Sequence, residues 1–130
     1  MEKDVICRVI SWVLEKICNS LSYCIKNKPI LCVTGWSFNP MYNTVVVHLD
    51  NSNDDNFDIK KIGTEGNLKY AGSCPINVLI GDSVDLRFCY MGNLKQSEKD
   101  NYCVTLHIAK KVLCRYKYKL YYKNGHIYYE

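Results

Sequence analysis

Hydrophobic and polar residues alternate in several short runs along this chain, with turn-forming residues between them. Residues 30–38 alternate and are rich in β-branched and aromatic side chains, and residues 44–49 are almost all β-branched. Such runs predict strands rather than helices. Asn39-Pro40 ends the first run, since Pro40 has no N–H, and the polar run 50–55 ends the second as an expected solvated turn. The two strands are therefore expected to form the first hairpin of an antiparallel β domain.

Similar alternation recurs towards the C-terminus. Residues 56–62 predict a third strand, residues 84–90 a fourth, and residues 101–112 a fifth. Residues 67–75 contain few apolar anchors and leave a short helix, a loop and a short strand open. Gly35 in the middle of the first strand predicts a bulge or a close backbone approach. Asn124-Gly125, between two β-prone runs, predicts a C-terminal hairpin.

Residues 4–25 have the three- and four-residue spacing of an amphipathic helix. One apolar stripe holds Ile6, Val9, Ile10, Val13, Ile17, Leu21 and Cys24, and a second holds Cys7, Leu14, Cys18 and Ile25. Together the two stripes cover more of the helix surface than packing against a single neighbour needs. Either the whole helix packs within its own domain, or one side packs on the β domain and the other binds a protein partner. For the second case we expect the contact residues to be Val9, Trp12, Val13 and Ile17.

Length and composition narrow the class of protein. A chain of 130 residues suggests one folded unit, with the helix in residues 1–27 and the β domain in residues 28–130. The net charge of +4 permits a polyanionic partner without requiring one. Most of the 8 cysteines are expected to be reduced, because five lie in or beside apolar runs: Cys32, Cys74, Cys89, Cys103 and Cys114. Charged residues interrupt the N-terminal apolar stretch, so we expect neither a secretory signal nor a membrane partner, and an intracellular location.

The sequence contains no recognisable catalytic set. His48, His107 and His126 fall on separate strands or turns, without a serine elbow or cysteine motif beside them. Cys-x-x-Cys is missing, and the aspartates of residues 50–55 lack the spacing of a calcium loop. No glycine-rich phosphate loop is present either. The expectation is a protein that is not an enzyme and uses no metal or cofactor.

The order of elements resembles a known family. Lys28-Pro29-Ile30, Val33-Thr34-Gly35 and the run Val47-His48-Leu49-Asp50-Asn51-Ser52 are similar to the opening of an OB-fold, as in the middle subunit of replication protein A and its counterpart in the telomeric CST complex. The segment 80–87, entered through Gly81-Asp82, resembles the fourth strand of that family. The resemblance spans residues 28–112. It implies a mainly β fold, with a small five-stranded OB-like antiparallel barrel, an N-terminal amphipathic helix and a C-terminal β-hairpin.

The resemblance also implies a function. OB-folds bind single strands by stacking bases on aromatic rings and following phosphates with Lys and Arg. The expected role is a non-catalytic subunit of a nuclear, telomere-associated or replication-type complex, with other protein subunits as partners and single-stranded DNA or RNA as ligand. The expected nucleic-acid contacts are Trp36, Tyr42, Lys60, Lys69, Tyr70, Arg87, Lys110, Lys111, Arg115 and Lys117.

A second family stays open. Residues 75–88 and 116–128 are similar to the closing strands of a galectin-type sandwich, although the sugar-binding His/Asn/Arg cluster of that family has no counterpart here. The alternative expectation is a galectin-like or viral β-sandwich recognition module that binds a protein or glycan partner.

Overall fold

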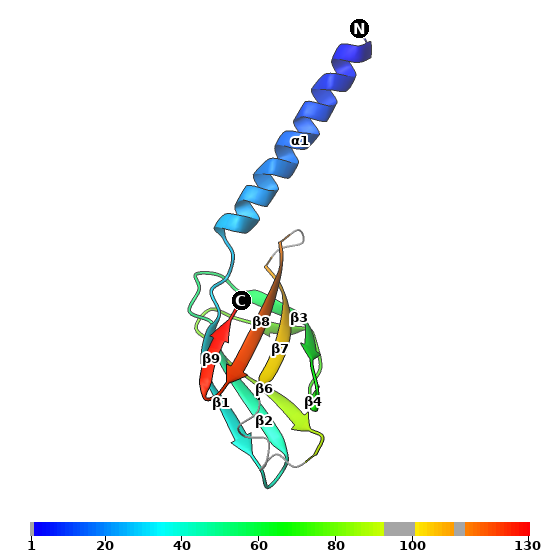
Figure 1. Ribbon diagram of the computed structural model, residues 1–130. Helices are drawn as coiled ribbons and strands as arrows, with labels where there is room; N and C mark the ends of the chain where they lie inside the picture. The colour runs from blue at the N-terminus through cyan, green and yellow to red at the C-terminus, as the bar shows by residue number, and fades with distance from the viewer. Residues whose placement is uncertain (1, 93–100, 111–113) are drawn as a thin grey trace.

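The computed structural model describes residues 2–92, 101–110 and 114–130 and contains one helix and two antiparallel sheets (Figure 1). The N-terminal helix is followed by strands only, so the chain is mainly β, as predicted. The elements are α1 (Glu2–Lys26), β1 (Cys32–Asn39), β2 (Thr44–Asp50), β3 (Phe57–Thr64), β4 (Leu68–Tyr70), β5 (Ile76–Val78), β6 (Ser83–Tyr90), β7 (Tyr102–Ala109), β8 (Arg115–Lys123) and β9 (His126–Tyr129).

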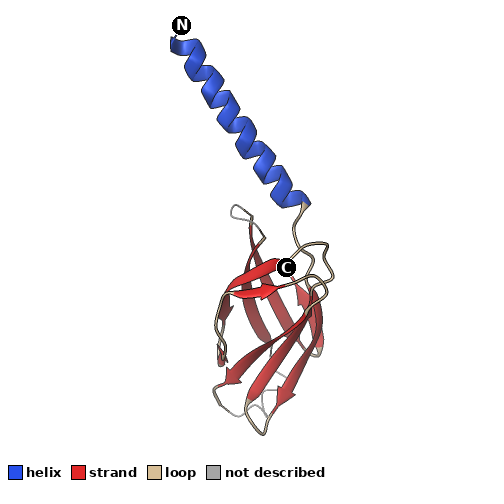
Figure 2. Ribbon diagram, turned by 180° about the vertical axis from the view of Figure 1, so that it is seen from behind, coloured by secondary structure: helices blue, strands red, loops and turns tan. Residues whose placement is uncertain are grey.

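The strands pair in two separate sheets (Figure 2). One has the order β1-β2-β6-β4 and the other the order β5-β3-β7-β8-β9. These sheets are not closed into a barrel, so the five-stranded barrel expected from the sequence is not confirmed. The physical reason lies in residues 68–78, which form two three-residue strands. One pairs with β6 and the other with β3, so this segment crosses from one sheet to the other.

The core lies between the two sheets and takes the inward side chains of both. On β2, Val45, Val47 and Leu49 are buried, and on β7 Val104 and Leu106 are buried, as strand alternation requires. Trp36 on β1 is also a core residue, with its ring 5.6 Å from that of Tyr122 and 6.2 Å from that of Tyr102.

Two local departures from regular strand structure occur at glycine-containing positions that the sequence singles out. The β1–β2 register shifts between Val33 and Gly35, which confirms the predicted bulge. Asn124 and Gly125 have φ of 51° and 82°, the conformation that a two-residue hairpin turn needs, and they join β8 to β9 as predicted. A second bulge, between Ile59 and Lys61 on β3, carries no such sequence signal.

The polar turn after β2 is more than a solvated connection. Asn51 is 1% exposed and its side-chain amide donates to the carbonyls of Asp55, Val78 and Leu79 at 3.0 to 3.2 Å. Its side-chain oxygen accepts from the backbone N–H of Asn53 at 3.0 Å. The expected solvated turn is therefore built around one buried asparagine, because the turn itself and residues 78–79 both bond to it.

Helix α1 projects away from the sandwich and is attached only at its C-terminal end (Figure 1). Cys24 forms a disulfide with Cys114, and the Tyr116 hydroxyl donates to the Cys24 carbonyl at 2.6 Å. Nearby, the Lys110 ammonium donates to the Asn27 carbonyl at 3.0 Å. The structure thus shows neither packing of the whole helix within its own domain nor packing of one of its sides on the β domain. The described residues include no helix with the length and apolar content needed to cross a membrane.

The disulfide corrects one cysteine assignment. Cys114 was expected to be a reduced core residue, but the chain brings it next to Cys24, 90 residues away. The other six cysteines are free.

Candidate anion-binding face

The outward face of the five-stranded sheet carries most of the chain's clustered cations. Alternation along β8 buries Tyr118 and Leu120 and turns the intervening Arg115, Lys117 and Lys119 to the outer face. The neighbouring strand β7 places His107 and Thr105 on the same face, because paired residues share a side.

Strand register aligns three of these side chains in a row. Lys61 on β3 pairs with His107 on β7, which pairs in turn with Lys117 on β8. Neighbouring strands lie about 4.8 Å apart, so the two ammonium-bearing residues flank one imidazole. The bulge on β3 adds Lys60 to this region, and its ammonium lies 3.6 Å from the Asp58 carboxylate. Like charges gathered on one face repel one another, and a bound anion would relieve that repulsion.

A shallow hollow of about 550 Å³ lies over this row. The residues that line it are Lys60, His107, Ile108, Arg115, Tyr116 and Lys117. Four of the six can carry a positive charge, so the hollow suits a negatively charged group such as phosphate or sulfate.

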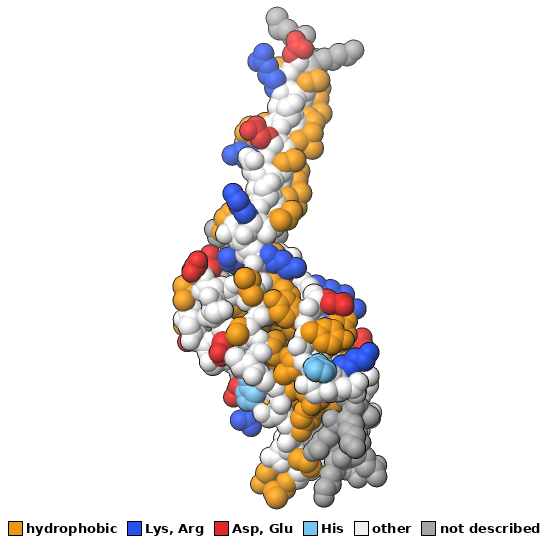
Figure 3. All heavy atoms as spheres, turned by 60° about the vertical axis from the view of Figure 1, so that its left-hand side comes forward, with side chains coloured by type: hydrophobic (Ala, Val, Ile, Leu, Met, Phe, Trp, Pro, Cys, Tyr) orange, Lys and Arg blue, Asp and Glu red, His pale blue; other side chains and the backbone are white. Residues whose placement is uncertain are grey.

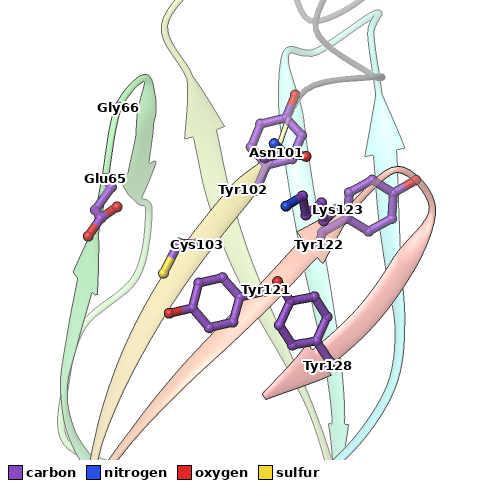
Figure 4. A pocket seen from close by; sticks show the side chains of 9 residues that line it. All are labelled: Glu65, Gly66, Asn101, Tyr102, Cys103, Tyr121, Tyr122, Lys123 and Tyr128. Carbon is purple, nitrogen blue, oxygen red and sulfur yellow. The ribbon is translucent and has the colours of Figure 1, made fainter. Parts of the chain in front are cut away.

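A second hollow, of about 440 Å³, lies further along the same face (Figure 4). Tyr121 and Tyr128 are cross-strand partners on β8 and β9, and their rings stack with centroids 4.9 Å apart and planes at 19°. Burial and then the nearby Glu65 carboxylate raise the pKa of the Cys103 thiol, which faces this hollow. The pKa of Tyr121 is also raised, first by desolvation and then by Glu130. Both groups are therefore neutral at pH 7, and the hollow offers an aromatic surface together with the Glu65 carboxylate and the Lys123 ammonium.

The two hollows lie on one track. His107 lines the first and Cys103 the second, four residues apart on β7, which corresponds to about 13 Å at 3.3 Å per residue. Lys119, the partner of Thr105, stands between them. Along β8 the face therefore presents first the cations of the first hollow, then Lys119, and then the stacked Tyr121–Tyr128 pair.

The structure brings together only some of the nucleic-acid contacts expected from the sequence. Lys60, Arg115 and Lys117 line the first hollow, and Lys110 lies near the helix base, where its ammonium is 3.4 Å from Asp55. Lys69 and Arg87 stand on the outer face of the other sheet, where they are exposed.

The expected aromatic contacts are scattered. Trp36 is buried in the core and Tyr70 packs half-buried against Phe88, with ring centroids 5.5 Å apart. Tyr42, in the turn between β1 and β2, is 71% exposed. Lys111 lies outside the described residues. The stacked pair Tyr121–Tyr128 was missed, although its signal was present: both tyrosines flank the predicted Asn-Gly turn, three residues away from it on each side.

The outer face of the four-stranded sheet holds a second polar group that the sequence did not reveal. Ser37 Oγ lies 2.8 Å from His48 Nε2, and His48 Nδ1 lies 2.6 Å from an Asp85 carboxylate oxygen. These are the residue types and contacts of a Ser-His-Asp triad. Backbone N–H groups in a sheet point along the sheet and not above its face, so none is aimed at an oxyanion beside Ser37. The geometry supports cross-linking of β1, β2 and β6 by side chains.

The expected partner contacts on the helix are all exposed: Val9, Trp12, Val13 and Ile17. Among the residues that the structure describes, no group of three or more His, Cys, Asp or Glu side chains is arranged to hold a metal ion. Comparison of the chain with models of known protein families, with curated proteins and with solved structures finds no match.

Proposed function

We propose that this chain is a non-catalytic recognition module that binds single-stranded nucleic acid on the outer face of its five-stranded sheet. The observation that carries the proposal is the row of Lys61, His107 and Lys117 on the same track as the stacked Tyr121–Tyr128 pair. Proteins that bind single strands combine cations for the phosphates with aromatic rings for the bases.

The dimensions of the track suit a short segment of strand. About 13 Å separates the two hollows, roughly the length of four nucleotides stacked at 3.4 Å. Phosphates would lie in the first hollow over Lys60, Arg115 and Lys117, and a base would pack on the exposed face of Tyr128. The chain has a net charge of only +4, so binding should be weak and should depend on salt.

The proposal keeps only part of what the OB-fold resemblance implies. It retains the ligand class and a role beside other protein subunits, since α1 leaves its apolar residues uncovered. A place in a replication protein A-like or CST-like complex is a narrower form of the same proposal, and the unclosed sheets weaken its basis. A nuclear location stays a prediction, and the Cys24–Cys114 disulfide fits an oxidising compartment better than the reduced cysteines on which that prediction rested.

Fluorescence anisotropy with a labelled single strand of roughly 12 nucleotides tests the proposal. The variant Arg115→Glu/Lys117→Glu reverses two charges on the track, and we expect it to bind roughly tenfold more weakly or not at all. If three to four phosphates are neutralised, the logarithm of affinity should fall against the logarithm of salt with a slope of about −2 to −3.

The matched control is Lys69→Glu/Arg87→Glu, which makes the same charge change on exposed positions of the opposite sheet. This variant should lose only the small part of the binding affinity that depends on the net charge of the protein. Equal losses in both variants would mean that binding follows total charge and no particular face. Absence of binding by the unmodified chain at about 50 mM salt would reject the proposal.

A second candidate is favoured by the pairing of the strands in two unclosed sheets, the arrangement of sandwich recognition modules. In this case the same cationic face would bind an anionic glycan or an acidic protein. Heparin fragments in the same anisotropy competition separate the two candidates. Displacement of the strand by heparin at equal charge concentration, together with tighter direct binding of heparin, would favour the second.

A further inference from the structure

Helix α1 exposes an apolar surface that is large for a chain of this size. Ten of its large hydrophobic side chains are between 41% and 78% exposed: Val5, Ile6, Val9, Ile10, Trp12, Val13, Leu14, Ile17, Leu21 and Ile25. Together they cover a wide arc of the projecting helix, and Figure 3 shows hydrophobic side chains along its length. Single exposed hydrophobic residues are ordinary, but a contiguous surface of this extent marks an interface.

The spacing of these residues says what kind of partner fits. Ile6, Ile10, Val13 and Ile17 occupy successive d and a positions over two heptads. The next d position is Ser20, and the next a position, Cys24, is bonded to Cys114. The line furthest from this seam, at f, is polar and holds Arg8, Glu15 and Ser22. A repeat with a polar f line is the pattern of a helix that packs lengthwise against other helices.

The width of the seam indicates more than one neighbouring helix. The e positions Cys7, Leu14 and Leu21 and the g position Val9 are also apolar, so each helix can contact a neighbour on both flanks of the seam. Ile and Val at both a and d favour trimers and tetramers over dimers.

Charges on the helix permit its own copy as the partner. In a parallel bundle each g residue faces the e residue five positions later on the next helix, which pairs Val9 with Leu14 and Lys16 with Leu21 of the neighbouring copy. Neither pair sets like charges against each other. The lysine stem can cover the leucine while its ammonium stays in water.

The attachment of the helix is compatible with the parallel arrangement. The Cys24–Cys114 disulfide and the Tyr116 hydroxyl bond to Cys24 join only the C-terminal end of α1 to the sandwich. The seam from Ile6 to Ile17 is therefore free along its length, and every sandwich would lie at the same end of the bundle. We propose that α1 assembles three or four copies of this chain into a parallel helical bundle, an assembly role that does not depend on the proposed ligand.

Light scattering behind size exclusion tests the assembly with the full chain. One copy has a mass of 15.1 kDa, and we expect roughly 45 to 60 kDa for the unmodified protein at micromolar concentration. Ile10→Glu/Ile17→Glu places two carboxylates in the seam and should give a monomer. Ser11→Glu/Ser22→Glu adds the same charges on the polar side of the helix and should leave the larger mass unchanged.

Cross-linking tests the orientation. With Cys18→Ser, a short bis-maleimide should join Cys7 to Cys7 of a neighbouring copy, whereas two fully overlapped antiparallel helices would place these thiols roughly 20 Å apart along the axis. Near-UV circular dichroism checks that each variant keeps its sandwich. The proposal is overturned by a monomeric unmodified chain, even one that then binds vesicles or another protein. It is equally overturned by dissociation of both Glu variants, or by an assembly without the Cys7 cross-link.

Discussion

At the scale of single residues, Asn51 contributes more to the stability of the fold than its position in a polar turn suggests. Its amide donates to three carbonyls, one in its own turn and two in residues 78–79, at distances of 3.0 to 3.2 Å. Aspartate has nearly the same shape but no donor, so it would leave these carbonyls unpaired and oppose them with a negative charge.

Asn51→Asp should therefore lower the free energy of unfolding by about 3 kcal/mol, which corresponds to a drop in Tm of roughly 10 °C. Urea and thermal unfolding followed by circular dichroism measure both. The control Ser52→Asp adds the same charge at an exposed residue of the same turn and should cost clearly less. A similar loss in both variants would show that the charge of the turn matters and the buried amide does not.

Tyr118 gives the fold a measurable sensitivity to alkali. Burial, followed by the neighbouring Tyr129 and Tyr116, raises the pKa of Tyr118, and its hydroxyl donates to the Pro29 carbonyl. In the unfolded chain a tyrosine ionises near pH ~10. The stabilisation is therefore complete below that pH and is lost as the pH rises from there towards the folded-state pKa, by about 1.4 kcal/mol per pH unit.

Urea unfolding at about pH 9 and about pH 11 measures this loss. Tyr118→Phe removes one titrating group, so the difference between the two pH values should shrink by about 1 kcal/mol. The pKa of Tyr70 and of Tyr116 is also raised, so the Tyr118→Phe variant will still lose some stability as the pH rises. An unchanged difference in Tyr118→Phe would mean that Tyr118 is ionised as readily in the folded chain as in the unfolded one.

At the scale of elements, the disulfide ties the helix to the far end of the chain. It closes a loop over a sequence separation of 90 residues, which includes nearly the whole sandwich, and so restricts the unfolded chain strongly. Cys24→Ser/Cys114→Ser should lower the free energy of unfolding by about 2 to 4 kcal/mol.

The control Cys7→Ser/Cys18→Ser changes two exposed thiols of the same helix and should leave the unfolding free energy of the sandwich nearly unchanged. Titration of the denatured, unreduced chain should find six free thiols. Eight thiols, or equal stability losses in the two double variants, would contradict the disulfide.

Most of the secondary-structure elements could be predicted from the sequence, but the sheet to which each strand belongs could not. Alternating runs predicted β1, β3, β6 and β7, a β-branched run predicted β2, and the Asn124-Gly125 turn predicted the last hairpin, because these signals are local. Strands of three residues, such as β4 and β5, are too short to show a period. Which sheet each strand joins depends on contacts between distant segments. For the same reason the Ser37–His48–Asp85 group, whose members lie 11 and 37 residues apart, appears only once the register is known.

At the scale of the whole molecule, the helix and the candidate anion-binding face lie in different parts of the structure. If α1 gathers several copies at one end of a bundle, several faces with Lys117 and Arg115 become linked. A strand long enough to reach two faces would then bind the second one intramolecularly, at a high effective concentration.

Length dependence of binding tests this combination of the two proposals. A short strand should bind the unmodified chain and Ile10→Glu/Ile17→Glu with equal affinity per copy, since each face acts alone. A strand several times longer should bind the unmodified chain at least roughly tenfold more tightly than the seam variant. Equal affinities for the long strand, with short-strand binding intact, would mean that the bundle does not let two faces engage one strand. Loss of short-strand binding in the seam variant would instead place the nucleic-acid contact on the helix, because Ile10 and Ile17 lie on α1, outside the proposed face.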